Sequence, residues 1–200
     1  MQSAQIRRLT LTAILIAFVF LLGLTPIGMI PLGFINVTIL VVPVVIGTIM
    51  LGLTSGLMIG FFFGSASLMS VLGLSMTPPS ALAGTLLASS PVLTVIMCYL
   101  PRLLIPVTVH FTYQTLSKLR RKGLELPVAS AVGSLTNTVL YLGLMYLFYR
   151  FASLDAGKIV NLILGTGFIA GISEAAVAAL VAPVVIIALR KALSIKEEVK

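Results

Sequence analysis

Six apolar stretches constrain this chain more than any other feature of its sequence, because each can cross the hydrocarbon core of a membrane as a helix. Such a crossing needs about 20 predominantly apolar residues. Two of the stretches are joined by a tight turn, and the last is long enough to project beyond the bilayer. They run over Leu9 to Leu24, Val37 to Leu53, Thr54 to Leu72, Val92 to Leu116, Pro127 to Tyr149 and Ile159 to Leu189. The pattern predicts an all-α membrane protein in which residues 1–200 form a single bundle of six transmembrane helices.

Composition points the same way. Hydrophobic residues make up 59% of the chain and charged residues only 9%, against about 25% charged residues in soluble domains. The formal charge of +8 does not indicate a nucleic-acid partner, because the basic residues gather at the ends of apolar runs instead of covering a solvated face. The first stretch has no small-residue cleavage site, so we expect it to be a spanning helix and not a signal peptide.

The distribution of basic residues predicts the orientation of the bundle. Six spans place both termini on one side, and that side collects ten Lys and Arg residues, whereas Arg150 and Lys158 are alone on the other. Both termini are therefore expected to be cytoplasmic. Two loops, Thr25 to Asn36 and Gly73 to Pro91, are then external. Both are uncharged and largely apolar, so we expect them to fold back onto the bundle and close over a ligand.

Small residues recur at helical spacing in two places. Gly52, Gly56, Gly60 and Gly64 follow one another at four-residue intervals, which predicts a face where a second helix approaches closely. Ala13 and Ala17 form a shorter pair on the first stretch. That pair fits close packing either within the bundle or against another protein.

Two charged residues lie inside predicted spans, where each costs roughly 2.5 to 3.5 kcal/mol on insertion scales and is a candidate functional group. Arg102 is about 14 Å from the external end of its helix at 1.5 Å per residue. Glu174 lies at a comparable depth, and Asn137 adds an amide at that level. Pro101 and Pro106 bracket Arg102 and free backbone carbonyls beside it.

These residues allow two interpretations. Arg102 and Glu174 form a buried salt bridge that needs no ligand, or Arg102 pairs with the carboxylate of a small solute while Asn137, and in one variant Glu174, bonds its amide or hydroxyl groups. Thr136 is a weaker candidate, because hydroxyls in membrane helices often bond their own backbone. Asn36 is either a helix N-cap or a ligand contact from the first loop.

Several kinds of chemistry have no residues to support them here. The sequence has no G-x-x-x-x-G-K-[ST] phosphate-binding loop, no H-E-x-x-H and no nucleophile elbow, so we expect neither an ATPase nor another enzyme. His110 is the single histidine, and a metal site would need further ligands at fixed spacing. No cofactor or metal is therefore predicted. A stand-alone proton-coupled carrier would have to rely on Glu174.

Four segments carry a resemblance to a known family. They read IPLGFINVTILVVPVVIGTIMLG from Ile30, GLMIGFFFGSASL from Gly56, PRLLIP from Pro101 and GSLTNTVLYLG from Gly133. Together they resemble the substrate-binding S components of energy-coupling factor (ECF) vitamin transporters, over nearly the whole chain, and most closely the pantothenate-specific members. The first helix of that family typically carries A-x-x-x-A, which Ala13 and Ala17 match.

The resemblance implies a subunit of a bacterial cytoplasmic-membrane importer that binds its vitamin from outside. It implies partners as well: a transmembrane T component, docked through Ala13 and Ala17, and two cytoplasmic ATPases that supply the energy. Pantothenate has a carboxylate, an amide and hydroxyls, which suit Arg102 and Asn137. Other carboxylate vitamins share part of that chemistry, and a hydroxymethylpyrimidine or pyridoxine carrier of the same family is the nearest alternative.

Overall fold

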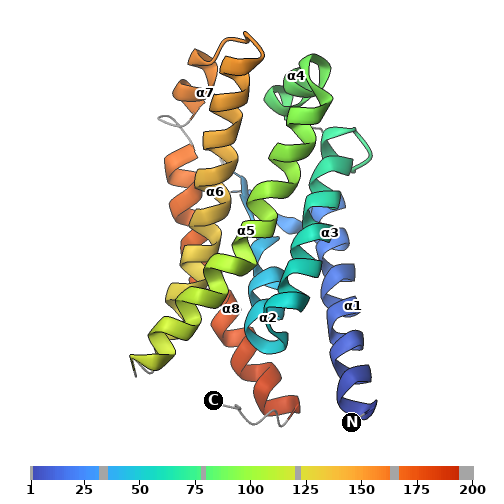
Figure 1. Cartoon of the computed structure of the whole chain (residues 1–200), viewed down its shortest axis with the longest axis vertical. Helices are drawn as coiled ribbons and strands as arrows, with labels where there is room; N and C mark the ends of the chain where they lie inside the picture. Colours follow the sequence, from blue (N-terminus) through green and yellow to red (C-terminus); the bar gives the residue numbers. More distant parts are fainter. Residues whose placement is uncertain (1, 32–35, 78–79, 120–122, 163–166, 194–200) are drawn as a thin grey trace.

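The computed structural model describes residues 2–31, 36–77, 80–119, 123–162 and 167–193. Long helices run side by side along the molecule (Figure 1). The elements in chain order are α1 (Gln2–Leu24), the short 3-10 helix η1 (Pro26–Gly28), β1 (Met29–Pro31), β2 (Asn36–Thr38), α2 (Val41–Leu51), α3 (Leu53–Val71), α4 (Ala81–Ser89), α5 (Pro91–Lys118), α6 (Glu125–Phe151), α7 (Gly157–Leu162) and α8 (Phe168–Leu193).

Five helices of the described chain are long and apolar enough to cross a membrane: α1, α3, α5, α6 and α8. The predicted helical and multi-pass character is thus confirmed, but six full spans are not. The predicted second span is helical only from Val41 to Leu51, which is 11 residues, or about 16 Å at 1.5 Å per residue. The predicted last span is described as two helices, α7 and α8.

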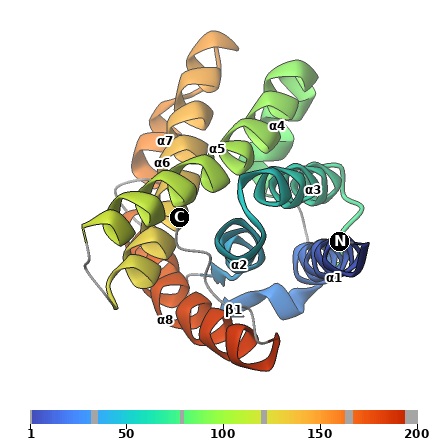
Figure 2. The same cartoon turned by 60° about the horizontal axis from the view of Figure 1, so that its bottom comes forward.

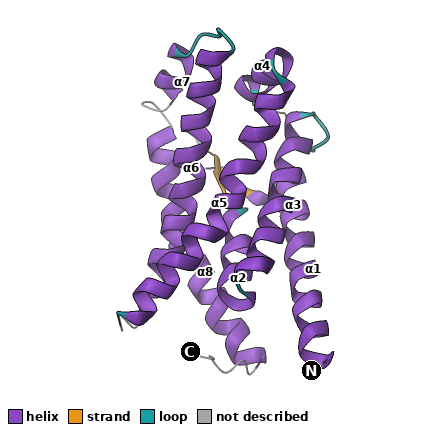
Figure 3. Cartoon of the chain, viewed as in Figure 1, coloured by secondary structure: helices purple, strands orange, loops and turns teal. Residues whose placement is uncertain are grey.

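A two-stranded antiparallel ribbon takes in part of the predicted first loop and the first two residues of the predicted second span. β1 pairs with β2 so that Met29 faces Thr38 and Pro31 faces Asn36, and the amide of Ile39 donates to the carbonyl of Gly28 at 3.2 Å. Figure 3 shows the strands between the helices, well short of the end where α4 and α7 lie. Strand pairing lets this segment enter the bundle because it satisfies backbone groups that lipid cannot. Sequence periodicity did not reveal it.

The two ends of the chain lie at the same end of the bundle, and α4 and α7 lie at the other (Figure 1). The turn between α2 and α3 is near the N-terminus, since Nε of Arg8 donates to Oγ of Ser55 at 3.1 Å. The helices α2 and α3 join at Gly52, which has a φ of 89°, a backbone conformation that glycine adopts without strain. The start of α1 and the turn at Gly52 therefore lie at the same end of the bundle.

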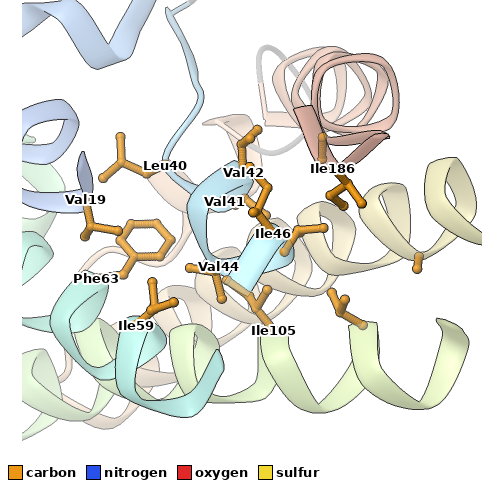
Figure 4. Close-up of a cluster of buried hydrophobic side chains, with 14 of the residues drawn as sticks. Val19, Leu40, Val41, Val42, Val44, Ile46, Ile59, Phe63, Ile105 and Ile186 are labelled. Carbon is orange, nitrogen blue, oxygen red and sulfur yellow. The ribbon is translucent and has the colours of Figure 1, made fainter. Parts of the chain in front are cut away.

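The short helix α2 is the centre of the bundle, with α1, α3, α5, α6 and α8 packed around it (Figure 2). Every residue from Val41 to Thr48 is buried. Figure 4 shows their side chains meeting Val19, Phe63 and Ile186 from three other helices. A helix that is apolar on all faces belongs in such an interior position.

The glycine stripe of α3 faces α5, as its spacing predicts. A Cβ atom on Gly56 would meet Pro106 at 2.9 Å, one on Gly60 would meet the carbonyl oxygen of Arg102 at 2.5 Å, and one on Gly64 would meet the ring of Tyr99 at 2.6 Å. Since no side chain intervenes, the backbone of α3 lies directly against the helix that carries the candidate site.

Candidate functional site

Arg102 lies in the middle of α5 and is only 8% exposed. The preceding residue, Pro101, has no amide hydrogen to give to the carbonyl of Met97, four residues earlier. That carbonyl accepts a hydrogen bond of 3.1 Å from Nη1 of Arg102 instead. The prolines on either side of Arg102 were predicted to free backbone carbonyls. Pro101 does so, because the carbonyl of Met97 that it leaves free binds one end of the guanidinium.

Two aromatic rings enclose the rest of the guanidinium. Its central carbon lies 4.7 Å from the centroid of Tyr141 on α6 and 5.2 Å from that of Phe63 on α3. Aromatic faces attract a cation, the more so where water is excluded. These contacts keep the charge of Arg102 inside the bundle and orient the planar group.

Asn137 lies on the same face of α6 as Tyr141, the face that packs against α5. Gly133, Asn137 and Tyr141 repeat at four-residue intervals on α6, and the first and last of them contact α5, at Val109 and Arg102 respectively. The intervening Asn137 is 7% exposed, and its Oδ1 is buried without a hydrogen-bond partner. Asn137 thus lies on the side of α6 that packs against α5, while its meeting with Arg102 stays a prediction.

Polar atoms near Asn137 remain unpaired in the described residues. Nε of Arg102 and Oγ of Ser134 are buried without hydrogen-bond partners, like Oδ1 of Asn137. An unmade bond at a buried polar group costs about 1 to 3 kcal/mol, and more for a charged one. A guanidinium donor, an amide acceptor and a hydroxyl that can donate or accept therefore favour a polar ligand between α5 and α6.

Glu174 approaches the same region from α8. Its Oε2 accepts a hydrogen bond of 3.2 Å from Oγ1 of Thr138 on α6, and its charge interacts with that of Arg102. The helices α6 and α8 lie close together at this point, as a Cβ added to Gly171 would lie 2.9 Å from the side chain of Thr138. Glu174 on α8 thus contacts α6 at Thr138, the residue that follows Asn137.

The other two candidates lie apart from this group. Oγ1 of Thr136 donates to the carbonyl of Val132 at 2.7 Å and lies 3.1 Å from Oγ1 of Thr108 on α5. It makes the backbone bond expected of a hydroxyl in a membrane helix. Asn36 begins β2, opposite Pro31, and so does not cap α2; its side chain lies outside the described residues.

Part of the second predicted loop is helix α4, which covers the end of the bundle above the site. Ala83 and Leu86 of α4 are fully buried against α5, α6 and α7. The hydroxyl of Tyr149 on α6 donates to the carbonyl of Leu82 at 2.7 Å. The expectation that this loop folds back onto the helices agrees with these contacts.

Three neighbours of the charged residues were not predicted from the sequence: Phe63, Tyr141 and Thr138. One signal was available for Tyr141, which lies four residues after Asn137 and so shares its helix face. Phe63 has no such signal, because its position depends on the packing of α3 against α5. No group of three or more His, Cys, Asp or Glu that could hold a metal occurs in the part of the chain that is described, and the site as a whole is suited to binding.

The comparison with protein families decides what kind of molecule this is. The model of the ECF transporter substrate-specific component matches residues 7–186, which includes every site residue described above. The chain belongs to this family. It is accordingly a membrane-embedded substrate-binding S component of a transporter and not an enzyme. No curated protein matches the sequence.

Proposed function

We propose that this S component binds pantothenate, a carboxylate vitamin, with Arg102 as the anion anchor and Asn137 as the partner of the ligand's amide or hydroxyl groups. The vitamin enters from the outside, and a T component and two ATPases drive its release into the cytoplasm of a bacterial cell. Helix α4 covers the bound ligand, together with the first loop, of which residues 32–35 lie outside the described part of the chain.

The proposal rests on the contacts of the Arg102 guanidinium, one edge of which has no partner. Nη1 is held by Met97, and the two ring contacts fix the plane, whereas the buried Nε has no partner. A carboxylate at the Nε edge would complete the pairing with charge-assisted hydrogen bonds, the geometry in which arginine binds carboxylates best.

Asn137 supplies the second point of contact. Its unpaired Oδ1 is an acceptor, so it suits an amide N–H or a hydroxyl of the ligand. Pantothenate carries its hydroxyls at the other end of the molecule from its carboxylate, and its amide lies between them. Glu174, which already accepts from Thr138, either contributes to ligand binding or balances the charge of Arg102.

The proposed contact with the T component is on α1. Ala13 and Ala17 are both exposed, so they are not used for packing inside this chain. The helix itself has the smallest buried share of the five candidate spans. A pair of exposed small residues, one turn apart, lets a second helix come close, which supports docking through this face.

The experiment that tests the substrate is a calorimetric titration of the purified chain with pantothenate and with pantothenol, which has a hydroxyl in place of the carboxylate. Hydroxymethylpyrimidine, pyridoxine and folate complete the series. One-to-one binding of pantothenate, weakened by at least about tenfold in pantothenol, is expected from the loss of a charge-assisted contact.

Other results separate the alternatives. Binding of hydroxymethylpyrimidine or pyridoxine alone would keep the family but overturn the substrate, and would favour a pairing of Arg102 with Glu174. Equal binding of pantothenate and pantothenol would overturn the anion anchor. Uptake by vesicles that contain only this chain, abolished by an uncoupler, would instead indicate a proton-coupled carrier.

A further inference from the structure

Helix α6 carries four serine and threonine side chains, and one of them lacks the bond that the other three make. Ser130, Thr136 and Thr138 each donate to the backbone carbonyl four residues earlier, at 2.7, 2.7 and 3.3 Å. The fourth, Ser134, is 1% exposed, and its Oγ has no hydrogen-bond partner among the described residues. Since hydroxyls in membrane helices commonly take that carbonyl bond, the unpaired hydroxyl of Ser134 is available to another group.

Ser134 lies on the side of α6 that faces the candidate site. At about 100° per residue, it is roughly 20° around the helix from Tyr141 and roughly 40° from Thr138. Tyr141 contacts Arg102 on α5, and Thr138 contacts Glu174 on α8. The position of Ser134 around the helix falls between these two contacts, and so in the sector of α6 between α5 and α8.

Asn137 offers a second atom for a shared contact. It lies three residues after Ser134, and side chains at this spacing are neighbours on a helix. Its Oδ1, which only accepts hydrogen bonds, is likewise buried without a partner, whereas Oγ of Ser134 can donate. One hydroxyl group between the two residues would satisfy both, because it donates to Oδ1 and accepts from Oγ. An amide N–H only donates, so it would leave the hydroxyl hydrogen of Ser134 without an acceptor.

We propose that Ser134 and Asn137 together bind a hydroxyl group of the substrate, and that Ser134 thereby selects for hydroxylated acids. This inference rests on the proposed binding of pantothenate, and it assigns the hydroxyl end of the vitamin, not its amide, to this pair of residues. Along α6, the rise from Tyr141 to Ser134 is about 10.5 Å at 1.5 Å per residue. Because Tyr141 contacts Arg102, this separation suits an extended pantothenate with its carboxylate at Arg102 and its terminal hydroxyl at Ser134.

The matched ligand for a test is dideoxypantothenate, which keeps the carboxylate and the amide but has hydrogen in place of both hydroxyls. A buried site built for a hydroxyl rejects the analogue that lacks it, because the polar groups of the site then stay unpaired. In calorimetric titration of the purified chain, dideoxypantothenate is therefore expected to bind at least about tenfold more weakly than pantothenate.

Ser134→Ala tests the residue itself, and Ser130→Ala is the matched control. Ser130 is fully buried one turn away on α6, and its Oγ is already bonded to the carbonyl of Leu126. Ser134→Ala is expected to weaken pantothenate binding about fivefold, the equivalent of one hydrogen bond, and to leave the affinity for dideoxypantothenate unchanged. The preference between the two ligands falls accordingly. Ser130→Ala is expected to change neither affinity.

Thermal unfolding of the ligand-free chain separates a binding role from a structural one. Removal of a hydroxyl that has no partner eliminates an unmade hydrogen bond, so the melting temperature of Ser134→Ala is expected to be equal to that of the parent chain or higher. A residue needed only for packing would instead lower the melting temperature and weaken the binding of both ligands alike.

Two results would overturn this inference while the proposed substrate stands. Equal weakening of pantothenate and dideoxypantothenate by Ser134→Ala would show that the hydroxyl of Ser134 binds a resident water molecule and not the substrate. Unchanged binding of pantothenate in that variant would show that the hydroxyl takes no part. Failure of the parent chain to bind pantothenate would overturn the proposed function, and this inference with it.

Discussion

Nη1 of Arg102 donates a hydrogen bond of 3.1 Å to the carbonyl oxygen of Met97, five residues earlier in the same helix. In a regular α-helix this carbonyl would accept from the amide of residue 101. Because residue 101 is proline, the backbone has a gap, and the side chain of the next residue fills it. The site thus anchors its cation with an acceptor that only a break in the helix provides.

Replacing that proline tests the relationship. Pro101→Ala restores an amide that competes with Nη1 for the carbonyl of Met97. We expect thermal stability to stay equal or rise, because an interior proline costs a helix about 3 kcal/mol, while affinity for the vitamin falls by about tenfold, the equivalent of one lost hydrogen bond to a charged group. Calorimetry and thermal unfolding measure the two effects. Pro183→Ala, in α8, is the control and should not weaken binding. Unchanged affinity in Pro101→Ala would contradict this role.

The charge of Arg102 and its shape make separate contributions. Arg102→Lys keeps the cation but loses the planar fork, so affinity should fall by about tenfold. Arg102→Ala removes both, and affinity should fall by about 100-fold. Titration calorimetry measures each, with Arg150→Ala as the exposed control. Binding within about threefold of the original in Arg102→Ala, or failure of that variant to insert, would indicate instead that Arg102 chiefly pairs with Glu174.

Gly60 limits the distance between α3 and the site. Gly60→Ala would place a Cβ 2.5 Å from the carbonyl oxygen of Arg102, so the helices must separate. Overpacking of this kind costs about 1 to 3 kcal/mol, and the melting temperature should fall. Gly143→Ala on α6 is the matched control, because nothing lies within 4 Å of its added Cβ; it should be neutral or stabilising. Similar melting temperatures for both variants would show that the contact is easily relieved.

The sequence was sufficient for the class of protein, and it drew attention to the charged residues of the candidate site. Length and hydropathy indicated the spans, and the cost of charge in lipid singled out Arg102 and Glu174. Two features were beyond it. The ribbon of β1 and β2 forms from a predicted apolar loop and the start of a predicted span, and only backbone pairing reveals it. The ring of Phe63 reaches Arg102 through helix packing, which a local pattern does not encode.

The hydroxyl of Tyr149 fastens α4 to α6 through the carbonyl of Leu82. Tyr149→Phe should lower stability by about 0.5 to 1.5 kcal/mol and speed dissociation of the vitamin if α4 covers the ligand. Stopped-flow dissociation and thermal unfolding measure these effects. Tyr146→Phe, on the same helix but 37% exposed, is the control. A loss of stability without faster dissociation would limit α4 to a structural role.

Close approach at α1 is tested by added bulk. Ala13→Trp should spare vitamin binding by the isolated chain and abolish uptake by the complete transporter, because the large ring keeps a second helix at a distance. Binding is measured by calorimetry and uptake with labelled vitamin in cells. Ala176→Trp, at an exposed alanine of α8, controls for the presence of an indole at the lipid-facing surface. Normal uptake by the Ala13→Trp variant would refute docking at this position.

The contact between Gly60 and the carbonyl of Arg102 has a consequence for redesigning the substrate range. Backbone atoms alone form this contact, on a helix shaped by two prolines. The position of the Arg102 backbone therefore cannot be changed by exchanging neighbouring side chains unless α3 also moves. The other side chains near the site come from α6 and α8 and can be exchanged one at a time. They are Asn137, Thr138, Tyr141 and Glu174. An engineer who wants to change the transported substrate would therefore leave α3 and α5 intact and vary the two other helices.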